Sequence, residues 1–240
     1  MTTRHRIVDA LNRALRRRDV SIQRWSKSTA AARAGFLARE GVDLAIDVGG
    51  YHGDYGRKLR LGGYGGPIHS FEPLPDAFAR LRAVASGDPG WHCHNVAIGA
   101  TSGTGRLHVS GNAVSSSLLP MLPAHEAGAP GSANVAEIEV ELRTLDDYRF
   151  QELAPRCALK IDVQGAERLV LEGASELLPS VRLLEMEMSL VELYAGQDLL
   201  VEQIVWLEGC GLRLVWLDRA FQDWSTGDLV QVDGIFRRVD

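Results

Sequence analysis

Apolar residues recur at helical spacing near the start of the chain and at strand spacing from residue 42 onward. Over residues 5–17, apolar side chains fall on one helical face, and arginine and asparagine occupy the other. A second helical stretch covers about 28–39. The pattern predicts an amphipathic helical extension, residues 1–42, ahead of a main domain, residues 43–240.

Short apolar runs alternate with helical stretches through the main domain. Helices are predicted at about 76–85, 167–178 and 198–209. Strands are predicted at 42–50, 66–73, 91–99, 157–162, 181–189, 212–218 and 229–239. This alternation indicates a three-layer α/β fold with a mostly parallel sheet.

One region departs from that alternation. Residues 106–110 and 136–145 alternate apolar and polar side chains with a period of two, which predicts antiparallel strands with one solvated face. The stretch between them is rich in serine, glycine, proline and alanine, so we expect a long loop at 111–135. Together with residues 190–198, this loop is where we expect ligand specificity to lie.

Composition predicts a packed domain, and the net charge argues against nucleic acid as its partner. The 240 residues are 45% hydrophobic and carry a formal net charge of −5, which argues against a protein that binds nucleic acid through its phosphates. The three cysteines are far apart, which fits a reducing compartment and predicts neither a disulfide framework nor a zinc site. There is no apolar run of about 18 residues, so no membrane span is expected. The N-terminus lacks the apolar segment of a signal peptide, and we expect a cytoplasmic protein.

The stretch AIDVGGYHGDYG, residues 45–56, places a glycine-rich turn directly after a buried strand. The spacing of its glycines fits neither the dinucleotide fingerprint nor a P-loop, which excludes the two common phosphate-binding turns. Asp47 and Asp54 would also repel a pyrophosphate. Glu72 follows at the end of the next strand, where an acid can accept both ribose hydroxyls. A nucleoside with a cationic or zwitterionic tail tolerates these acids, so the pattern predicts S-adenosylmethionine (SAM) as the cofactor.

Four segments together resemble the FkbM family of SAM-dependent methyltransferases. They are IDVGGYHGDY, FEP (71–73), NVAIG (95–99) and LKIDVQGAE (159–167). The resemblance extends over roughly residues 43–238. It implies the class I SAM-dependent methyltransferase fold, a Rossmann-like seven-stranded, mostly parallel sheet with helices on both faces and an antiparallel last strand. It also implies O-methylation of a hydroxyl on a sugar, glycolipid, polysaccharide or related metabolite.

The resemblance carries cofactor-binding roles onto particular residues. The family's turn usually contains Gly-Ala-Asn, whereas here it contains Gly49-Gly50-Tyr51, so a phenol replaces an asparagine amide near the methionine tail. The implied roles are the methionine part for Asp47, Gly49 and Gly53, the ribose for Glu72, and the adenine for Asn95, Val96 and Ala97. Gly50, Tyr51 and Pro73 are the other expected cofactor-binding residues.

Acids at strand ends are the candidate general bases for taking the proton from an acceptor hydroxyl. The resemblance places Asp162 beside the methyl group, and Glu187 and Glu185 share one face of the next strand. Burial would raise the pKa of such a carboxylate and make it a better base. Ion pairs with helix arginines are the structural alternative for these acids, and Asp162 with Glu187 could also hold Mg²⁺ through oxygen ligands.

Other side chains suit a polar acceptor. The serine run 115–117 could close over the cofactor or contact the acceptor. Tyr194 and Trp224 could stack on a sugar ring, and packing as ordinary aromatics is the alternative for both. The histidine candidates for a base are His52, His92 and His94. The alternative to an enzyme is a non-catalytic SAM-binding module that docks a partner through its N-terminal helices, and homo-oligomerisation is left open.

Overall fold

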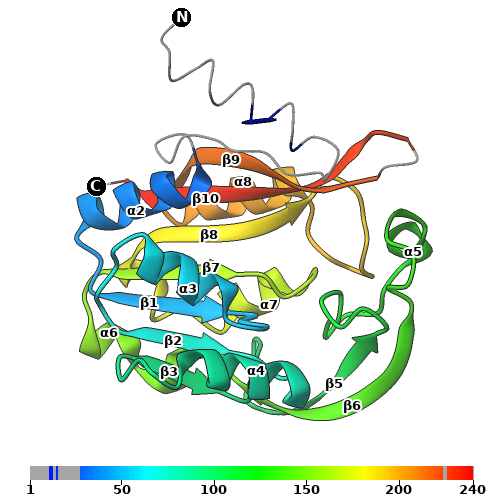
Figure 1. The fold of residues 1–240 in the computed structure, drawn as a ribbon, viewed down its shortest axis with the longest axis horizontal. Helices are drawn as coiled ribbons and strands as arrows, with labels where there is room; N and C mark the ends of the chain where they lie inside the picture. The colour runs from blue at the N-terminus through cyan, green and yellow to red at the C-terminus, as the bar shows by residue number, and fades with distance from the viewer. Residues whose placement is uncertain (1–10, 13–14, 16–27, 224–225, 240) are drawn as a thin grey trace, which may run out of the picture.

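A seven-stranded sheet forms the centre of the molecule, with helices on both faces (Figure 1). The computed structural model describes residues 11–12, 15, 28–223 and 226–239, so most of the helix expected at 5–17 lies outside the described residues. The strand order is β3-β2-β1-β7-β8-β10-β9. In that order the strands are Trp91–His94, Ile68–Phe71, Leu44–Val48, Cys157–Ile161, Val181–Ser189, Leu229–Arg238 and Leu212–Gln222. β10 pairs antiparallel with both β8 and β9, and the remaining pairs are parallel, so the predicted sheet is confirmed.

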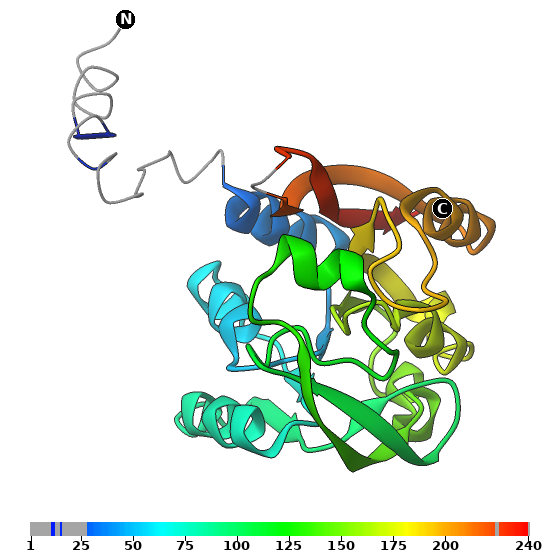
Figure 2. The same cartoon turned by 90° about the vertical axis from the view of Figure 1, so that its right-hand side faces the viewer.

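The helices form two layers that enclose the sheet (Figure 2). One layer contains α2 (Thr29–Glu40), α3 (Asp54–Leu61) and α4 (Pro75–Ala85). The other contains α6 (Phe150–Leu153), α7 (Glu167–Glu172) and α8 (Leu200–Gly209). The start and end of α2 follow local rules, because the Ser28 hydroxyl accepts from the Ala31 N–H and Gly41 ends the helix in the left-handed region.

Side chains alternate between the two faces of β1 and so contribute to both hydrophobic cores. Leu44, Ile46 and Val48 pack with α7 and α8, whereas Ala45 packs with α2, α3 and α4. On the face that α2, α3 and α4 cover, the side chains of β1, β7, β8 and β10 are apolar in the middle of the sheet. Toward one edge, the side chains on this face are charged. These are Asp47, Lys160, Asp162, Glu185, Glu187 and Asp233. One face of four central strands is therefore apolar at its middle and charged at the edge where ligands bind in such sheets.

A small second sheet stands beside the carboxyl ends of β1 and β2. It has the order β4-β6-β5, with β4 at Ala97–Ile98, β5 at Gly103–Ser110 and β6 at Asn134–Arg143. β5 and β6 pair antiparallel, as their period of two predicts. Figures 1 and 2 show this sheet and α5 (Pro123–Gly128) on the side of the main sheet where β1 and β2 end.

Three predicted elements differ from those observed. The strand expected at 91–99 is two strands in two sheets, because the Asn95 amide donates to the Glu72 and Pro73 carbonyls and pins the chain as it leaves β3. The loop expected at 111–135 contains α5. The helix expected at 167–178 ends at Glu172, and Gly173 follows it where only glycine can pass the Gly99 carbonyl, since a Cβ would lie 2.1 Å from that oxygen. The 3-10 turns are η3 (Asp146–Tyr148) and η4 (Leu178–Ser180).

Candidate active site

The glycine turn after β1 is wedged between the ends of β2 and β7. The N–H groups of Gly49 and Gly50 donate to the Phe71 carbonyl at 3.0 and 2.8 Å. Gly49 has a φ of 79°, and a Cβ on it would lie 1.8 Å from the Asp162 carbonyl oxygen. Only glycine fits where a left-handed conformation and such a close backbone approach coincide. Gly53, also left-handed, precedes α3.

Tyr51 occupies the same turn with a φ of 44°. A residue with a side chain seldom adopts this region, and asparagine tolerates it better than tyrosine does. The asparagine that the resemblance implies at this position would therefore fit the backbone better as well as supply an amide. The Tyr51 ring stacks on His52 at 3.6 Å between centroids, and its N–H donates to Glu72 at 2.7 Å.

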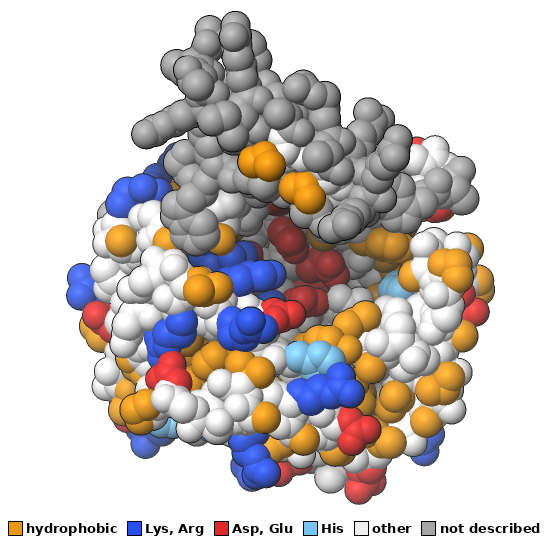
Figure 3. All heavy atoms as spheres, viewed as in Figure 1, with side chains coloured by type: hydrophobic (Ala, Val, Ile, Leu, Met, Phe, Trp, Pro, Cys, Tyr) orange, Lys and Arg blue, Asp and Glu red, His pale blue; other side chains and the backbone are white. Residues whose placement is uncertain are grey.

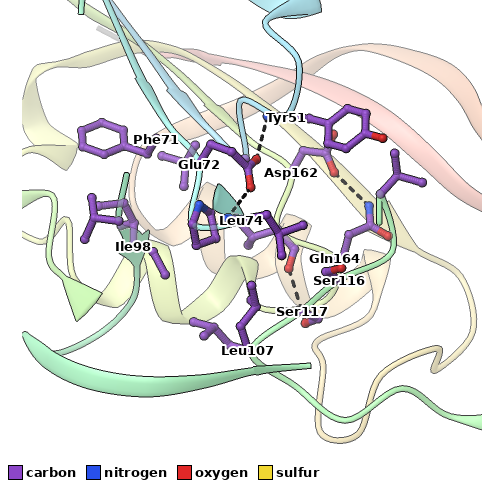
Figure 4. Close-up of a pocket in the computed structure, with 18 of the residues that line it drawn as sticks. Tyr51, Phe71, Glu72, Leu74, Ile98, Leu107, Ser116, Ser117, Asp162 and Gln164 are labelled. Atoms are coloured by element: carbon purple, nitrogen blue, oxygen red, sulfur yellow. Dashed lines mark hydrogen bonds between the residues drawn. The ribbon is translucent and has the colours of Figure 1, made fainter. Parts of the chain in front are cut away.

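Glu72 lies at the end of β2 and faces a cleft (Figure 4). It is 5% exposed, and its two oxygens accept from the N–H groups of Tyr51 and Leu74. Burial raises the pKa of Glu72, and the backbone donors oppose that shift. Each carboxylate oxygen has two lone pairs, so Glu72 can still accept from hydroxyl groups in the cleft.

The cleft beside Glu72 has a volume of about 170 Å³, far more than one water molecule needs. Its wall is largely apolar, and the serine run contributes Ser116 and Ser117. Asn95 is not part of the wall, since its amide holds the turn after β2. The lining includes Val48, Gly49, Tyr51, Phe71, Glu72, Pro73, Val96, Ala97, Ile98, Leu107, Leu118 and Asp162.

Lys160 ties the turn to the end of β7, and the sequence patterns did not single it out. Its ammonium lies 2.7 Å from the Gly49 carbonyl oxygen, 3.2 Å from Asp47 Oδ1 and 3.5 Å from Asp162 Oδ2. Asp47 is fully buried beneath the turn, and its carboxylate accepts a hydrogen bond from the Ser70 hydroxyl at 2.9 Å. It therefore does not line the cleft. Although burial alone would lower the pKa of Lys160, its neighbouring carboxylates raise it above the ordinary value.

Gln164, also missed by sequence reasoning, holds two of the predicted bases. Its amide nitrogen lies 2.9 Å from both Asp162 Oδ1 and Glu187 Oε2, and its amide oxygen accepts from the Tyr194 hydroxyl at 3.0 Å. Tyr194 is fully buried, so it is an ordinary packed aromatic and does not stack on a sugar ring. Trp224, the other predicted stacking residue, lies outside the described residues.

Comparison with known proteins identifies the family. The sequence matches the profile described as the Methyltransferase FkbM domain over residues 47–214. The chain belongs to the FkbM methyltransferase family. No protein with a curated description matches it.

Methyltransferases are among the solved structures similar to this chain. An rRNA methylase from Streptococcus thermophilus is 12% identical, with a TM-score of 0.50, covering 92% of this chain and 100% of that one. The SAM-bound magnesium protoporphyrin IX methyltransferase from Synechocystis PCC 6803 is 10% identical, with a TM-score of 0.47, covering 88% of this chain and 78% of that one. The observed strand order with its antiparallel β10 is that of the class I SAM-dependent methyltransferase fold.

A second cavity of the chain lies between α2, α3 and the ends of β7, β8 and β10. Its volume is about 240 Å³, and Gly49, Tyr51 and Asp162 line both this cavity and the cleft. Figure 3 shows acidic side chains gathered in a hollow, with basic side chains beside them. The charged residues of the lining are Arg33, Asp54, Lys58, Lys160, Asp162, Glu185, Glu187 and Asp233.

The three predicted bases have different environments. Glu185 forms an ion pair with Arg33 of α2, with 2.5 Å between Oε2 and Nε, which is the helix-arginine alternative that the sequence left open. Burial raises the pKa of Glu187 well above its usual range, and repulsion from Asp162 and Asp233 adds to the shift. The Asp162 side chain is 41% exposed and stands where the two cavities meet.

Two further predictions concern metal and membrane. In the part of the chain that the structure describes, no group of three or more histidine, cysteine or acidic side chains is arranged to hold a metal ion, so the Mg²⁺ prediction gains no support. No described helix has the length and apolar character needed to span a membrane.

The predicted histidines do not come together at the site. His52 lines the second cavity, whereas His94 lies at the edge of the sheet, stacked on Phe71 at 4.6 Å between centroids. His92 and His94 both contact His69 there. The edge histidines form a packed cluster away from the two cavities.

Proposed function

We propose that this chain transfers a methyl group from SAM to a hydroxyl of a sugar, glycolipid, polysaccharide or related metabolite. The observation that carries the proposal is that the cleft and the second cavity share Gly49, Tyr51 and Asp162. Two ligand-sized spaces with a common wall suit a donor in one and an acceptor in the other.

The cleft residues fit a nucleoside. Glu72 offers buried acceptor oxygens for the ribose hydroxyls, and Val96, Ala97 and Leu107 offer an apolar surface for a flat base. Gly49, Gly50 and Tyr51 would lie along the methionine tail. SAM supplies the methyl group as part of a sulfonium.

Asp162 is our first choice of general base, with Glu187 second. Asp162 lines both spaces, and its orientation is set by Gln164 at one oxygen and Lys160 near the other. An acceptor hydroxyl in the second cavity would give its proton to this carboxylate as its oxygen takes the methyl group. Glu185 is bound to Arg33 of α2, and we propose that it holds this helix against the second cavity rather than taking the proton.

Titration calorimetry with S-adenosylhomocysteine tests the cofactor assignment. Wild type should bind, Glu72→Ala should bind at least about tenfold more weakly because charged hydrogen bonds to the ribose are lost, and the exposed-carboxylate control Glu172→Ala should match wild type. Equal affinity of Glu72→Ala and Glu172→Ala would contradict the ribose role.

Radiolabelled methyl transfer to a panel of sugars and glycolipids tests the reaction. Asp162→Asn should lower turnover by about 10²–10⁴-fold while S-adenosylhomocysteine still binds. Cofactor binding without transfer to any acceptor would favour a non-catalytic binding module instead.

A further inference from the structure

The second cavity places two carboxylates directly opposite each other. Asp233 of β10 is the register partner of Glu187 of β8 in an antiparallel pair. Directly opposed residues point to the same face, with their Cβ atoms about 5 Å apart, and like charges in that arrangement destabilise a sheet. Both residues line the cavity. Sheet stability alone would not favour this pair.

No cation of the lining forms an ion pair with Glu187 or Asp233, although the charges of Arg33 and Lys160 lower the pKa of Asp233 in opposition to its burial. Arg33 is bound to Glu185, and the Lys160 ammonium is surrounded by Asp47, Asp162 and the Gly49 carbonyl. Lys58, on the exposed side of α3, forms no ion pair with either member. Within the described residues, neither side chain of the pair therefore has an ion-pair partner.

Their hydrogen bonds are also incomplete. Glu187 Oε2 accepts from the amides of Gln164 and Gln231 at 2.9 and 2.7 Å, whereas Oε1 accepts from none of the described residues. The side-chain carboxylate of Asp233 neither accepts a hydrogen bond nor forms an ion pair within the described part of the chain. Burial, with repulsion from Glu185 and Asp162, raises the pKa of Asp233 to about 6.

A ligand that brings positive charge and hydrogen-bond donors would satisfy both groups at once. A protonated amine has up to three N–H donors and a full charge, whereas a hydroxyl has one donor and no charge. Charge-assisted hydrogen bonds are about twice as strong as neutral ones. The unpaired carboxylates thus select for an amine rather than for a further hydroxyl.

We propose that Glu187 and Asp233 bind a protonated amine of the methyl acceptor, so that the acceptor is a hydroxyl compound that carries an amine, namely an amino sugar. This inference rests on the proposed function, because it takes the second cavity as the acceptor site. The amine serves as an anchor and the methylated atom remains a hydroxyl oxygen. SAM carries an ammonium of its own, so the test must separate the two sources of positive charge.

Calorimetry on the full chain, saturated with S-adenosylhomocysteine at neutral pH, distinguishes an amine of the acceptor from the ammonium of the cofactor. The probes are glucosamine, galactosamine, mannosamine and kanosamine, each compared with its neutral parent sugar. At least one amino sugar should bind about tenfold or more tightly than its parent. Glu187→Gln/Asp233→Asn should reduce that preference to less than about threefold and leave the affinity for S-adenosylhomocysteine unchanged.

Asp218→Asn is the matched control, because Asp218 faces Asp233 from β9 but does not line the cavity. It should keep the preference for amines. The single variant Asp233→Asn should lower the preference as well, and it provides the same test if the double variant does not fold.

Three results would overturn the inference. They are no amino sugar binding better than its parent, a preference that survives in the double variant, and a loss of S-adenosylhomocysteine affinity in the double variant in place of a lost amine preference. The third would assign the pair to the cofactor's own ammonium. Failure of wild type to bind S-adenosylhomocysteine would instead refute the proposed function.

Discussion

The ammonium of Lys160 lies 3.2 Å from Asp47 Oδ1, and the side chain of Asp47 has no exposed surface. The same ammonium contacts the Gly49 carbonyl and lies 3.5 Å from Asp162 Oδ2. One buried cation therefore links the residue beneath the glycine turn to the candidate base at the end of β7.

Lys160→Met should lower the free energy of unfolding by about 3–5 kcal/mol, because it leaves the Asp47 carboxylate buried without its cation. Urea unfolding measures the loss. Lys58→Met, on the exposed side of α3, is the control and should stay within about 0.5 kcal/mol of wild type. Adding Asp47→Asn to Lys160→Met should restore part of the stability, and no restoration would contradict the pairing.

Gly49→Ala should lower the free energy of unfolding by more than the positive φ of Gly49 alone accounts for. Gly63 has a similar φ of 88°, but a Cβ there meets nothing within 4 Å, whereas at Gly49 it meets the Asp162 carbonyl oxygen. Gly63→Ala thus isolates the cost of the backbone conformation. We expect Gly49→Ala to lose about 1–3 kcal/mol more stability in urea unfolding, since overpacking is added to that cost. Equal losses would mean that the close approach is unimportant.

Tyr194→Phe should lower the free energy of unfolding by about 1–2 kcal/mol, because it removes a buried hydroxyl that lies 3.0 Å from both the Ser115 carbonyl oxygen and Gln164 Oε1. Turnover should also fall, since Gln164 holds Asp162 and Glu187. The Tyr148 hydroxyl makes no hydrogen bond to the described residues, so Tyr148→Phe should leave both measurements unchanged. A similar effect from the two variants would argue that lost packing, not the hydroxyl, is responsible.

His69 should make the protein less stable on mild acidification. Burial, with repulsion from His94 and His92, lowers the pKa of His69 to about 4, against about 6.5 for an unfolded chain. The unfolded state therefore binds more protons between these values, and stability falls as the pH drops from about 6.5 toward 4. The urea midpoint of His69→Gln should fall less than that of wild type between pH 6.5 and pH 5. An identical pH dependence in the two proteins would refute the contribution of His69.

Local patterns were enough to predict the fold class and most of the elements. Short apolar runs marked the strands of the main sheet, and the glycine turn with Glu72 marked the candidate cofactor site. The strand at 91–99 was the clearest error, because the division between β3 and β4 depends on the Asn95 amide reaching carbonyls more than 20 residues earlier in the chain. No local pattern carries such a contact.

The candidate site divides in the same way. Asp162, Glu72 and the turn residues were predictable, since a strand end followed by an acid or a glycine is visible in one short segment. Lys160, Gln164 and Asp233 were not, because their importance comes from partners on other strands. Lys160 and Asp47 meet only because β1 and β7 are register neighbours, and Asp233 faces Glu187 only because β10 runs antiparallel to β8. Sequence periodicity specifies which face of a strand a side chain occupies, whereas strand order and register specify what it meets there, and those arise from long-range packing.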